Sequence, residues 1–109
     1  MNFTTPDGRY FVIKGQLWRC SDPSLNETAR QRYVDELMSA RREVKSAKAT
    51  SNSQQLKAAR TRVQAAKVAL GERGPVWWND GSSDLNRHQV SNTHYAQWYR
   101  TVCDEASKI

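Results

Sequence analysis

Apolar and small side chains recur every three or four residues along two neighbouring segments of this chain, and this periodicity constrains the fold more than any other feature. The two stripes are Tyr33, Leu37, Ala40, Val44 and Ala47, and then Leu56, Ala59, Val63, Ala66 and Leu70. Such spacing places the side chains on one face of an α-helix. Only a short polar break, residues 50–53, separates the stripes, so the two helices should pack antiparallel. The sequence therefore predicts a long antiparallel αα-hairpin over residues 24–71.

Both ends of this helical hairpin carry end signals. Ser24 and Glu27 have the spacing of a capping box, in which the two side chains satisfy free backbone N–H groups at the start of a helix. Gly71 follows the last apolar position and suits the left-handed residue that ends many helices. We therefore expect the first helix to start at Ser24 and the second to end at Gly71.

The remaining segments predict a small sheet and one more helix. Two runs of β-branched and aromatic residues within residues 9–20 flank Lys14-Gly15 and predict a β-hairpin. Residues 72–109 combine a turn-rich, tryptophan-containing loop with a C-terminal helix that Asn92 and Thr93 can cap. With 109 residues, 38% of them hydrophobic, the chain should form a single domain with one modest core. The predicted fold class is α+β, mainly α.

Several classes of protein are disfavoured by what the sequence lacks. The first eight residues contain no apolar run, and no stretch approaches the roughly 20 apolar residues of a membrane span. Cys20 and Cys103 lie far apart and lack the spacing of a zinc site or a disulfide framework. We therefore expect a cytoplasmic protein with reduced thiols, without a membrane partner, a metal site or a cofactor.

Positive charge is concentrated in the predicted helical hairpin. Residues 27–73 contain eleven Lys or Arg and five Asp or Glu, a difference that equals the +6 net charge of the whole chain. This pattern favours a surface that binds the phosphates of nucleic acid without sequence preference, or another acidic partner. The alternative is a solvated face whose charge Glu36 and Glu43 partly compensate. The candidate nucleic-acid-binding residues are Arg41, Arg42, Lys45, Lys48, Lys57, Arg60 and Lys67.

A pair of tryptophans, Trp77 and Trp78, lies in a turn-rich segment between two glycines. Both follow Pro75, which favours an extended backbone whose successive side chains point in opposite directions. One ring can therefore be buried while the other is not. The simpler interpretation is that the pair completes a small core, because aromatic rings bury large areas. The alternative interpretation is a stacking platform in a ligand-binding or catalytic site.

Polar residues around the tryptophans define this alternative site, which comprises Trp77, Trp78, Asp80, Asp84, Asn86 and Arg87. Carboxylates can act as general acids or bases, and an arginine can bind a phosphate or carboxylate with two hydrogen bonds. The spacing matches no catalytic or metal-binding motif, so we assign no catalytic residue. Simpler structural roles are a turn at Asp80, a cap at Asp84 and an ion pair from Arg87 to either carboxylate.

A third alternative is self-association through the helical hairpin. It requires the helices to expose Leu37, Val44, Leu56 and Val63 instead of burying them against each other.

Three segments resemble a group of short uncharacterised bacterial proteins. The segments are PDGRYFVIKGQLWRC, VDELMSARREV and the stretch that begins ALGERGPVWWNDG. The group carries a GRLWR-like hairpin, an ELMxARR helix and a GERGPVWW motif, and the resemblance covers nearly the whole chain. Gln16 replaces a basic residue of the group's pattern, and His94 replaces a proline. The resemblance implies no activity, cofactor or site.

Overall fold

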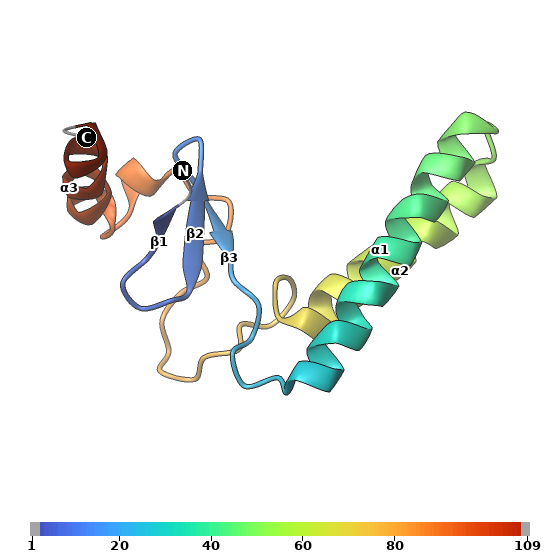
Figure 1. Cartoon of the computed structure of the whole chain (residues 1–109), viewed down its shortest axis with the longest axis horizontal. Helices are drawn as coiled ribbons and strands as arrows, with labels where there is room; N and C mark the ends of the chain where they lie inside the picture. Colours follow the sequence, from blue (N-terminus) through green and yellow to red (C-terminus); the bar gives the residue numbers. More distant parts are fainter. Residues whose placement is uncertain (1–2, 108–109) are drawn as a thin grey trace. The chain divides into compact units, whose positions relative to one another are not determined.

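The computed structural model describes residues 3–107, and it confirms the α+β, mainly α class. In chain order the elements are β1 (Phe3–Thr4), β2 (Tyr10–Ile13), β3 (Gln16–Arg19), α1 (Glu27–Ala49), α2 (Ser53–Leu70), the short 3-10 helix η1 (Val90–Asn92) and α3 (Ala96–Ser107) (Figure 1). Contacts between residues divide the chain into two compact units. We call residues 21–77 the hairpin unit, and the described parts of residues 1–20 and 78–109 the sheet unit.

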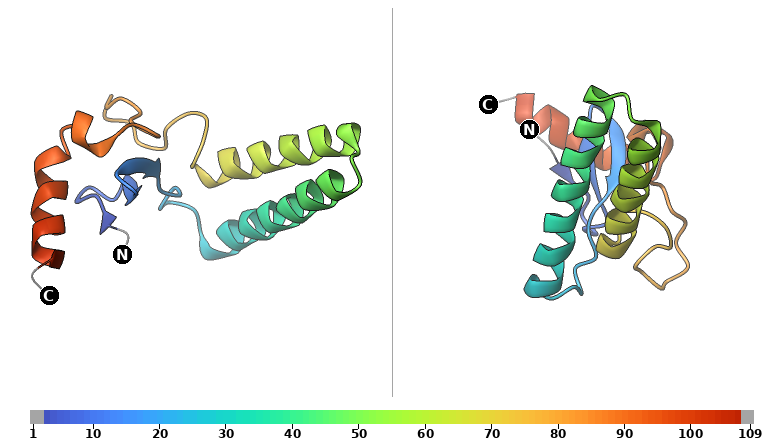
Figure 2. Two further views of the ribbon diagram at one scale, coloured as in Figure 1. Left: turned by 90° about the horizontal axis from the view of Figure 1, so that it is seen from above. Right: turned by 90° about the vertical axis from the view of Figure 1, so that its right-hand side faces the viewer.

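The hairpin unit is the predicted antiparallel pair of helices. Helices α1 and α2 lie side by side and run antiparallel (Figure 2). Leu37, Ala66 and Leu70 form its buried cluster. Three further alanines of the two stripes, Ala40, Ala47 and Ala59, are also buried. Because alanine side chains are small, the two backbones can approach closely, and the stripes account for the packing.

The start of α1 differs from the prediction of a cap at Ser24. The helix begins at Glu27, and its N-cap is Asn26, whose Oδ1 accepts a 2.7 Å hydrogen bond from the backbone N–H of Ala29. Ser24 instead donates its hydroxyl proton to Asp22 at 2.8 Å. The capping-box prediction was wrong because Asn is as strong an N-cap as Ser, and the nearby Asp22 carboxylate binds the serine.

The end of α2 is the predicted left-handed glycine. Gly71 has φ +86°, and its N–H donates to the carbonyls of Lys67 and Val68. A Cβ at this position would lie 2.9 Å from the Cβ of Asp22 and 3.0 Å from Cδ1 of Trp77. The N–H of Asp22 also donates to the carbonyl of Leu70 at 2.8 Å, so the chain enters the hairpin unit beside its exit. Gly71 is therefore required both by its backbone angle and by the close approach of its neighbours.

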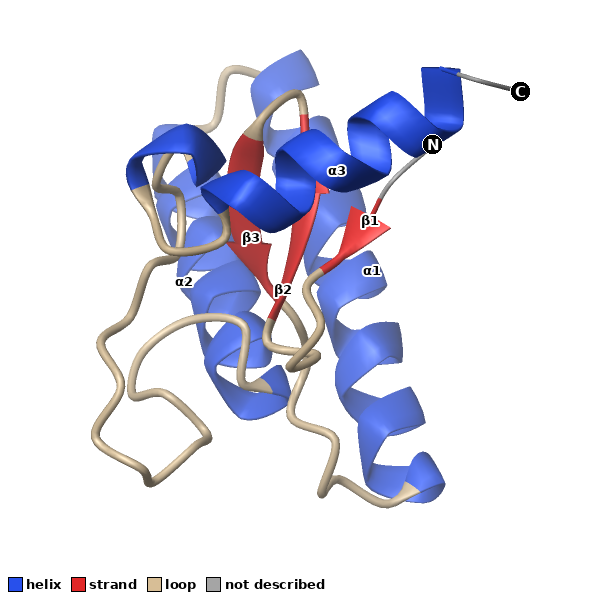
Figure 3. Cartoon of the chain, turned by 90° about the vertical axis from the view of Figure 1, so that its left-hand side faces the viewer, coloured by secondary structure: helices blue, strands red, loops and turns tan. Residues whose placement is uncertain are grey.

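The sheet unit contains a three-stranded antiparallel sheet in the order β1-β2-β3. The predicted β-hairpin is confirmed, since Lys14 and Gly15 both have positive φ, as the tight primed turn between β2 and β3 requires. Strand β1 was not predicted, because two residues are too few to carry a pattern. The strands are red in Figure 3, with α3 beside them.

One face of this sheet is buried. Opposite pairs Tyr10 with Arg19 and Val12 with Leu17 point to that face, and all four side chains are buried. The outer edge of β3 is covered by residues 87–90, whose backbone exchanges hydrogen bonds with residues 15–17. Paired and covered edges prevent the strand from pairing with other chains.

The predicted C-terminal helix is present as α3. It packs beside η1, and Tyr99 contacts the ring of Phe3 edge to face at 6.3 Å. Its N-terminus is supported by Thr93, whose carbonyl accepts from the N–H of Ala96 and whose hydroxyl accepts from the N–H of Tyr95. Over the described residues, no helix has the length and apolar character needed to cross a membrane.

Candidate functional site

Two surfaces have the composition of a binding site, one in each unit. The first consists of the seven basic residues predicted from sequence, and we call it the cationic surface. Six of the seven side chains belong to exposed residues, and Lys67 is half-buried. Three of them, Arg41, Lys45 and Lys48, follow one another at spacings of four and three residues, so they span about 60° of the helix circumference and a rise of about 10 Å. Arg42 lies on the adjacent face of α1.

The cationic surface is not neutralised by the carboxylates on the same helices. Arg62 binds Glu36 at 2.7 Å and also pairs with Glu43, so this single guanidinium holds both acids across the hairpin. Within residues 3–107, none of the seven cations lies within ion-pair distance of a carboxylate. The sequence suggested that these two glutamates partly compensate the charge of the predicted surface. They instead neutralise Arg62, which is not one of its seven residues.

Cations from both helices share one electrostatic field. The pKa of Lys67 lies below its ordinary value, first because burial disfavours its charged form, and then because Arg73 and Arg41 repel it. Glu72 offsets part of this effect. Since Arg41 belongs to α1 and Lys67 to α2, the two basic faces meet at this point of the hairpin unit.

The two tryptophans belong to different units. Trp78 is 9% exposed in the core of the sheet unit, where its ring meets that of Tyr10 edge to face and its Nε1–H donates to the carbonyl of Ser82 at 2.9 Å. Trp77 is half-buried in the hairpin unit beside Gly71. Trp78 therefore completes the core of the sheet unit, whereas Trp77 is only partly covered.

The other residues of the predicted ligand site mostly hold the sheet unit together. Asp84 binds Arg19 at 3.0 Å, and the amide oxygen of Asn86 accepts from the backbone N–H of Arg19 at 2.9 Å. Arg87 has φ +75°, and its N–H donates to the carbonyl of Leu17. We predicted an ion pair from Arg87 to Asp80 or Asp84, and this was wrong. The partners are arginines of the sheet region, because the folded chain brings strand residues beside the loop.

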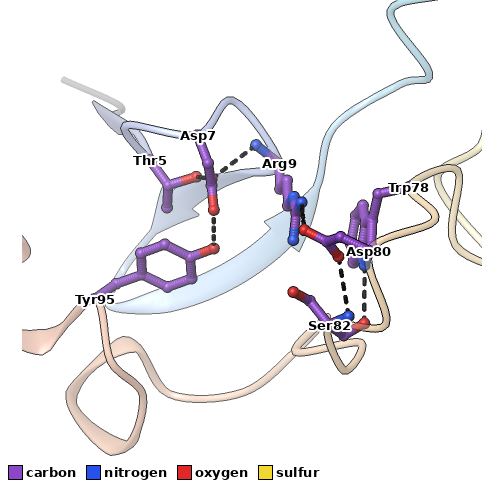
Figure 4. Close-up of polar contacts among 7 residues, drawn as sticks. All are labelled: Thr5, Asp7, Arg9, Trp78, Asp80, Ser82 and Tyr95. Carbon is purple, nitrogen blue, oxygen red and sulfur yellow. Dashed lines mark hydrogen bonds and ion pairs between the residues drawn. The ribbon is translucent and has the colours of Figure 1, made fainter.

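The second surface is a pocket of about 620 Å³ in the sheet unit, which we call the polar pocket. It is lined by Asp7, Arg9, Tyr10, Asp80, Ser82, Ser83, Leu85, His94 and Tyr95. Of the six residues in the predicted ligand site, only Asp80 lines it. Figure 4 shows Asp7 and Tyr95 on one side, and Arg9, Asp80 and Ser82 on the other.

Hydrogen bonds fix the first side of the polar pocket. Asp7 accepts the hydroxyl protons of Tyr95 at 2.5 Å and Thr5 at 2.7 Å, and the backbone N–H of Arg9 at 3.1 Å. Burial raises the pKa of Asp7, but these bonds outweigh it and leave the pKa below its ordinary value. The pKa of Tyr95 is raised, first by burial and then by its bond to Asp7. Asp7 is therefore a carboxylate and Tyr95 a neutral phenol at neutral pH.

An ion pair fixes the second side. Arg9 pairs with Asp80, while its guanidinium lies over the ring of Trp78 at 4.7 Å. The Arg9 bond and the 3.0 Å bond from the N–H of Ser82 lower the pKa of Asp80 to about 2. The Arg9 side chain is 18% exposed and that of Asp80 is 50% exposed, so the pair stands at the mouth of the pocket.

Sequence reasoning did not find Asp7, Arg9 or Tyr95 as site residues. Arg9 and its partner Asp80 are separated by 71 residues in the chain, and Asp7 and Tyr95 by 88 residues. The only local signal was Asp7-Gly8, which predicts a turn but not its partners.

No metal site accompanies these surfaces among the described residues, since they contain no group of three or more His, Cys, Asp and Glu placed to hold an ion. Within residues 3–107, Cys20 and Cys103 form no disulfide, and both are half-buried. Comparisons with protein-family models, with curated proteins and with solved structures give no match for this chain. Function is therefore inferred from the geometry of the two surfaces.

Proposed function

We propose that the hairpin unit binds nucleic acid by contacting phosphates with its cationic surface, without reading base sequence. The observation that carries this proposal is the absence of any ion pair to its seven cations within residues 3–107, although four carboxylates lie on the same pair of helices. Like charges on one surface repel, and repulsion from Arg73 and Arg41 adds to the larger effect of burial in lowering the pKa of Lys67. A bound polyanion relieves this repulsion and releases its own counterions, which is the main source of non-specific affinity.

The make-up of the surface favours nucleic acid over an acidic protein. Stable protein interfaces depend on aromatic or large apolar anchors at their centre. Between Arg41 and Lys48 the exposed positions of α1 carry only short or charged side chains, such as Ser46. A surface of separate charges on a rigid helix suits a repeating phosphate backbone.

A salt titration with duplex DNA tests the proposal. If each of the seven cations neutralises one phosphate, the slope of log K against log salt concentration reaches roughly −6. The triple variant Arg41→Gln, Lys45→Gln, Lys48→Gln should bind more weakly and should have a slope smaller by roughly 3. Fluorescence anisotropy of a labelled duplex measures both quantities.

A matched variant separates local from overall charge. Lys14, Arg87 and Arg100 are exposed cations of the sheet unit, and changing all three to Gln removes the same net charge. The slope of log K against log salt concentration for this control should equal that of the unchanged protein within experimental error. If both triple variants lose affinity equally, binding depends on net charge alone and the assigned surface is wrong. If polyglutamate competes as well as duplex DNA, the partner is an acidic polymer of another kind.

A further inference from the structure

The polar pocket belongs to the sheet unit, not to the unit that carries the cationic surface, and its charge is of the opposite sign. Its lining contains two carboxylates and one guanidinium, so with histidine counted as neutral it carries a net charge of −1. Both carboxyl pKa values lie below their ordinary range, so both groups are ionised at neutral pH. A concave, negatively charged site on a chain of net charge +6 calls for its own explanation.

We propose that the polar pocket binds a small organic amine, with the ammonium group against the carboxylates of Asp7 and Asp80 and the apolar part against Leu85. This proposal does not depend on the function of the hairpin unit.

The carboxylates have acceptor capacity left for an ammonium group. A carboxylate offers about four lone-pair sites. Asp7 uses three of them, for Tyr95, Thr5 and the N–H of Arg9. Asp80 is half-exposed, and its known donors are Arg9 and Ser82. An ammonium group brings three donors and no acceptor, so it can complete both shells without displacing the bonds that fix the pocket.

Leu85 suits the apolar part of such a ligand. It is a half-buried side chain of the pocket lining. Tyr10 and Tyr95, which also line the pocket, are buried and pack edge to face at 5.8 Å, so their rings form its floor and contribute little exposed surface. An apolar side chain beside charged groups can hold a hydrocarbon body next to the charged end, as is usual in ligand pockets.

An anion fits the same pocket poorly. Arg9 is the one guanidinium in the lining, and it is already bound to Asp80 and stacked on Trp78. A carboxylate or phosphate that reached Arg9 would have to displace Asp80 and approach Asp7, which is also negative. Because like charges repel, the two carboxylates of the lining disfavour the binding of an anion.

Three probes of one shape but different charge test the inference: phenethylammonium, 2-phenylethanol and phenylacetate. Each is titrated into the full-length ¹⁵N-labelled protein, and amide chemical shifts are followed. Phenethylammonium should bind with a Kd in the roughly millimolar range expected for so small a ligand. Its shifts should concentrate at Asp80, Ser82, Ser83, Leu85 and Tyr95. The neutral alcohol should bind more weakly, and phenylacetate should not bind at the same concentrations.

Two variants assign the charge that matters. Asp80→Asn should weaken phenethylammonium binding by about fivefold, the upper end for an exposed ion pair. Glu105→Gln, at an exposed acid of α3 outside the lining, should leave the Kd unchanged. The inference is overturned if phenylacetate binds as well as the amine, if the shifts lie elsewhere, if Asp80→Asn binds like the unchanged protein, or if no probe binds up to tens of millimolar. The comparison of the three probes on the unchanged protein decides the matter even if the variant does not fold.

Discussion

At the scale of single residues, Asp84 stabilises the fold because it forms an ion pair with the buried guanidinium of Arg19. The Arg19 side chain has no exposed surface, whereas that of Asp84 is 41% exposed. Asp84→Ala should lower the free energy of unfolding by about 2 kcal/mol, below the 3–5 kcal/mol for a fully buried pair because Asp84 itself is partly solvated. Urea denaturation measures this change. The control Glu105→Ala removes an exposed acid of the same unit, and a similar loss in both variants would deny Asp84 a special role.

The hydrogen bond from Tyr95 to Asp7 leads to a second prediction at this scale, which concerns how the stability of the protein depends on pH. The pKa of Asp7 is lowered on folding, so its contribution to stability is present above the unfolded pKa and is lost as pH falls through the folded pKa. Tyr95→Phe removes one donor, so it should raise the pKa of Asp7 and cost about 1–2 kcal/mol near neutral pH. A carboxyl NMR titration measures the pKa. Tyr99→Phe is the control, and an unmoved Asp7 pKa in Tyr95→Phe would contradict the prediction.

At the scale of elements, the junction between α2 and the following loop depends on a glycine. Gly71→Ala combines a positive φ with a Cβ 2.9 Å from the Cβ of Asp22 and 3.1 Å from its backbone nitrogen. We expect it to destabilise the protein by more than about 2 kcal/mol. Gly74→Ala shares the positive φ, but its nearest neighbour is the exposed side chain of Val68 at 3.3 Å. It should cost only the backbone term of about 1 kcal/mol. Equal denaturation midpoints for the two variants would contradict this account.

Local periodicity made these elements predictable, while the contacts between them were not. Apolar and small residues that recur every three or four positions identified α1 and α2. The pair Lys14-Gly15 identified the turn between β2 and β3. The exact start of α1 was missed because Ser24 and Asn26 are both good caps, and only the folded chain decides between them. The polar pocket was missed because its ion pair joins residues far apart in sequence, and no local rule places an arginine beside a distant aspartate.

At the scale of the whole molecule, most of the net positive charge lies in the hairpin unit. Residues 21–77 contain eleven basic and six acidic residues, and the rest of the chain contains six and five. The single domain expected from length stays a prediction. The two proposed sites lie in different units and share no residue, so we expect them to act independently.

Independence of the two sites can be measured directly. Duplex DNA should shift amide resonances within residues 41–67, and phenethylammonium should shift those of the polar pocket. Saturation with the amine should change the Kd for DNA by less than about twofold, since the two sites share no residue through which one ligand could alter the contacts of the other. A larger change would show that the sites are coupled. Because the coupling would be reciprocal, DNA would then change the Kd for the amine by the same factor.

The stripes of the helical hairpin repeat every seven residues, since Tyr33, Ala40 and Ala47 on α1 and Leu56, Val63 and Leu70 on α2 follow one another at that interval. Removing seven consecutive residues from each helix would therefore leave the same face inward, and adding seven would do the same. Each step changes the length of the two helices by about 10 Å. The helical hairpin could therefore be lengthened or shortened in steps of seven residues per helix without changing which kinds of side chain meet between α1 and α2.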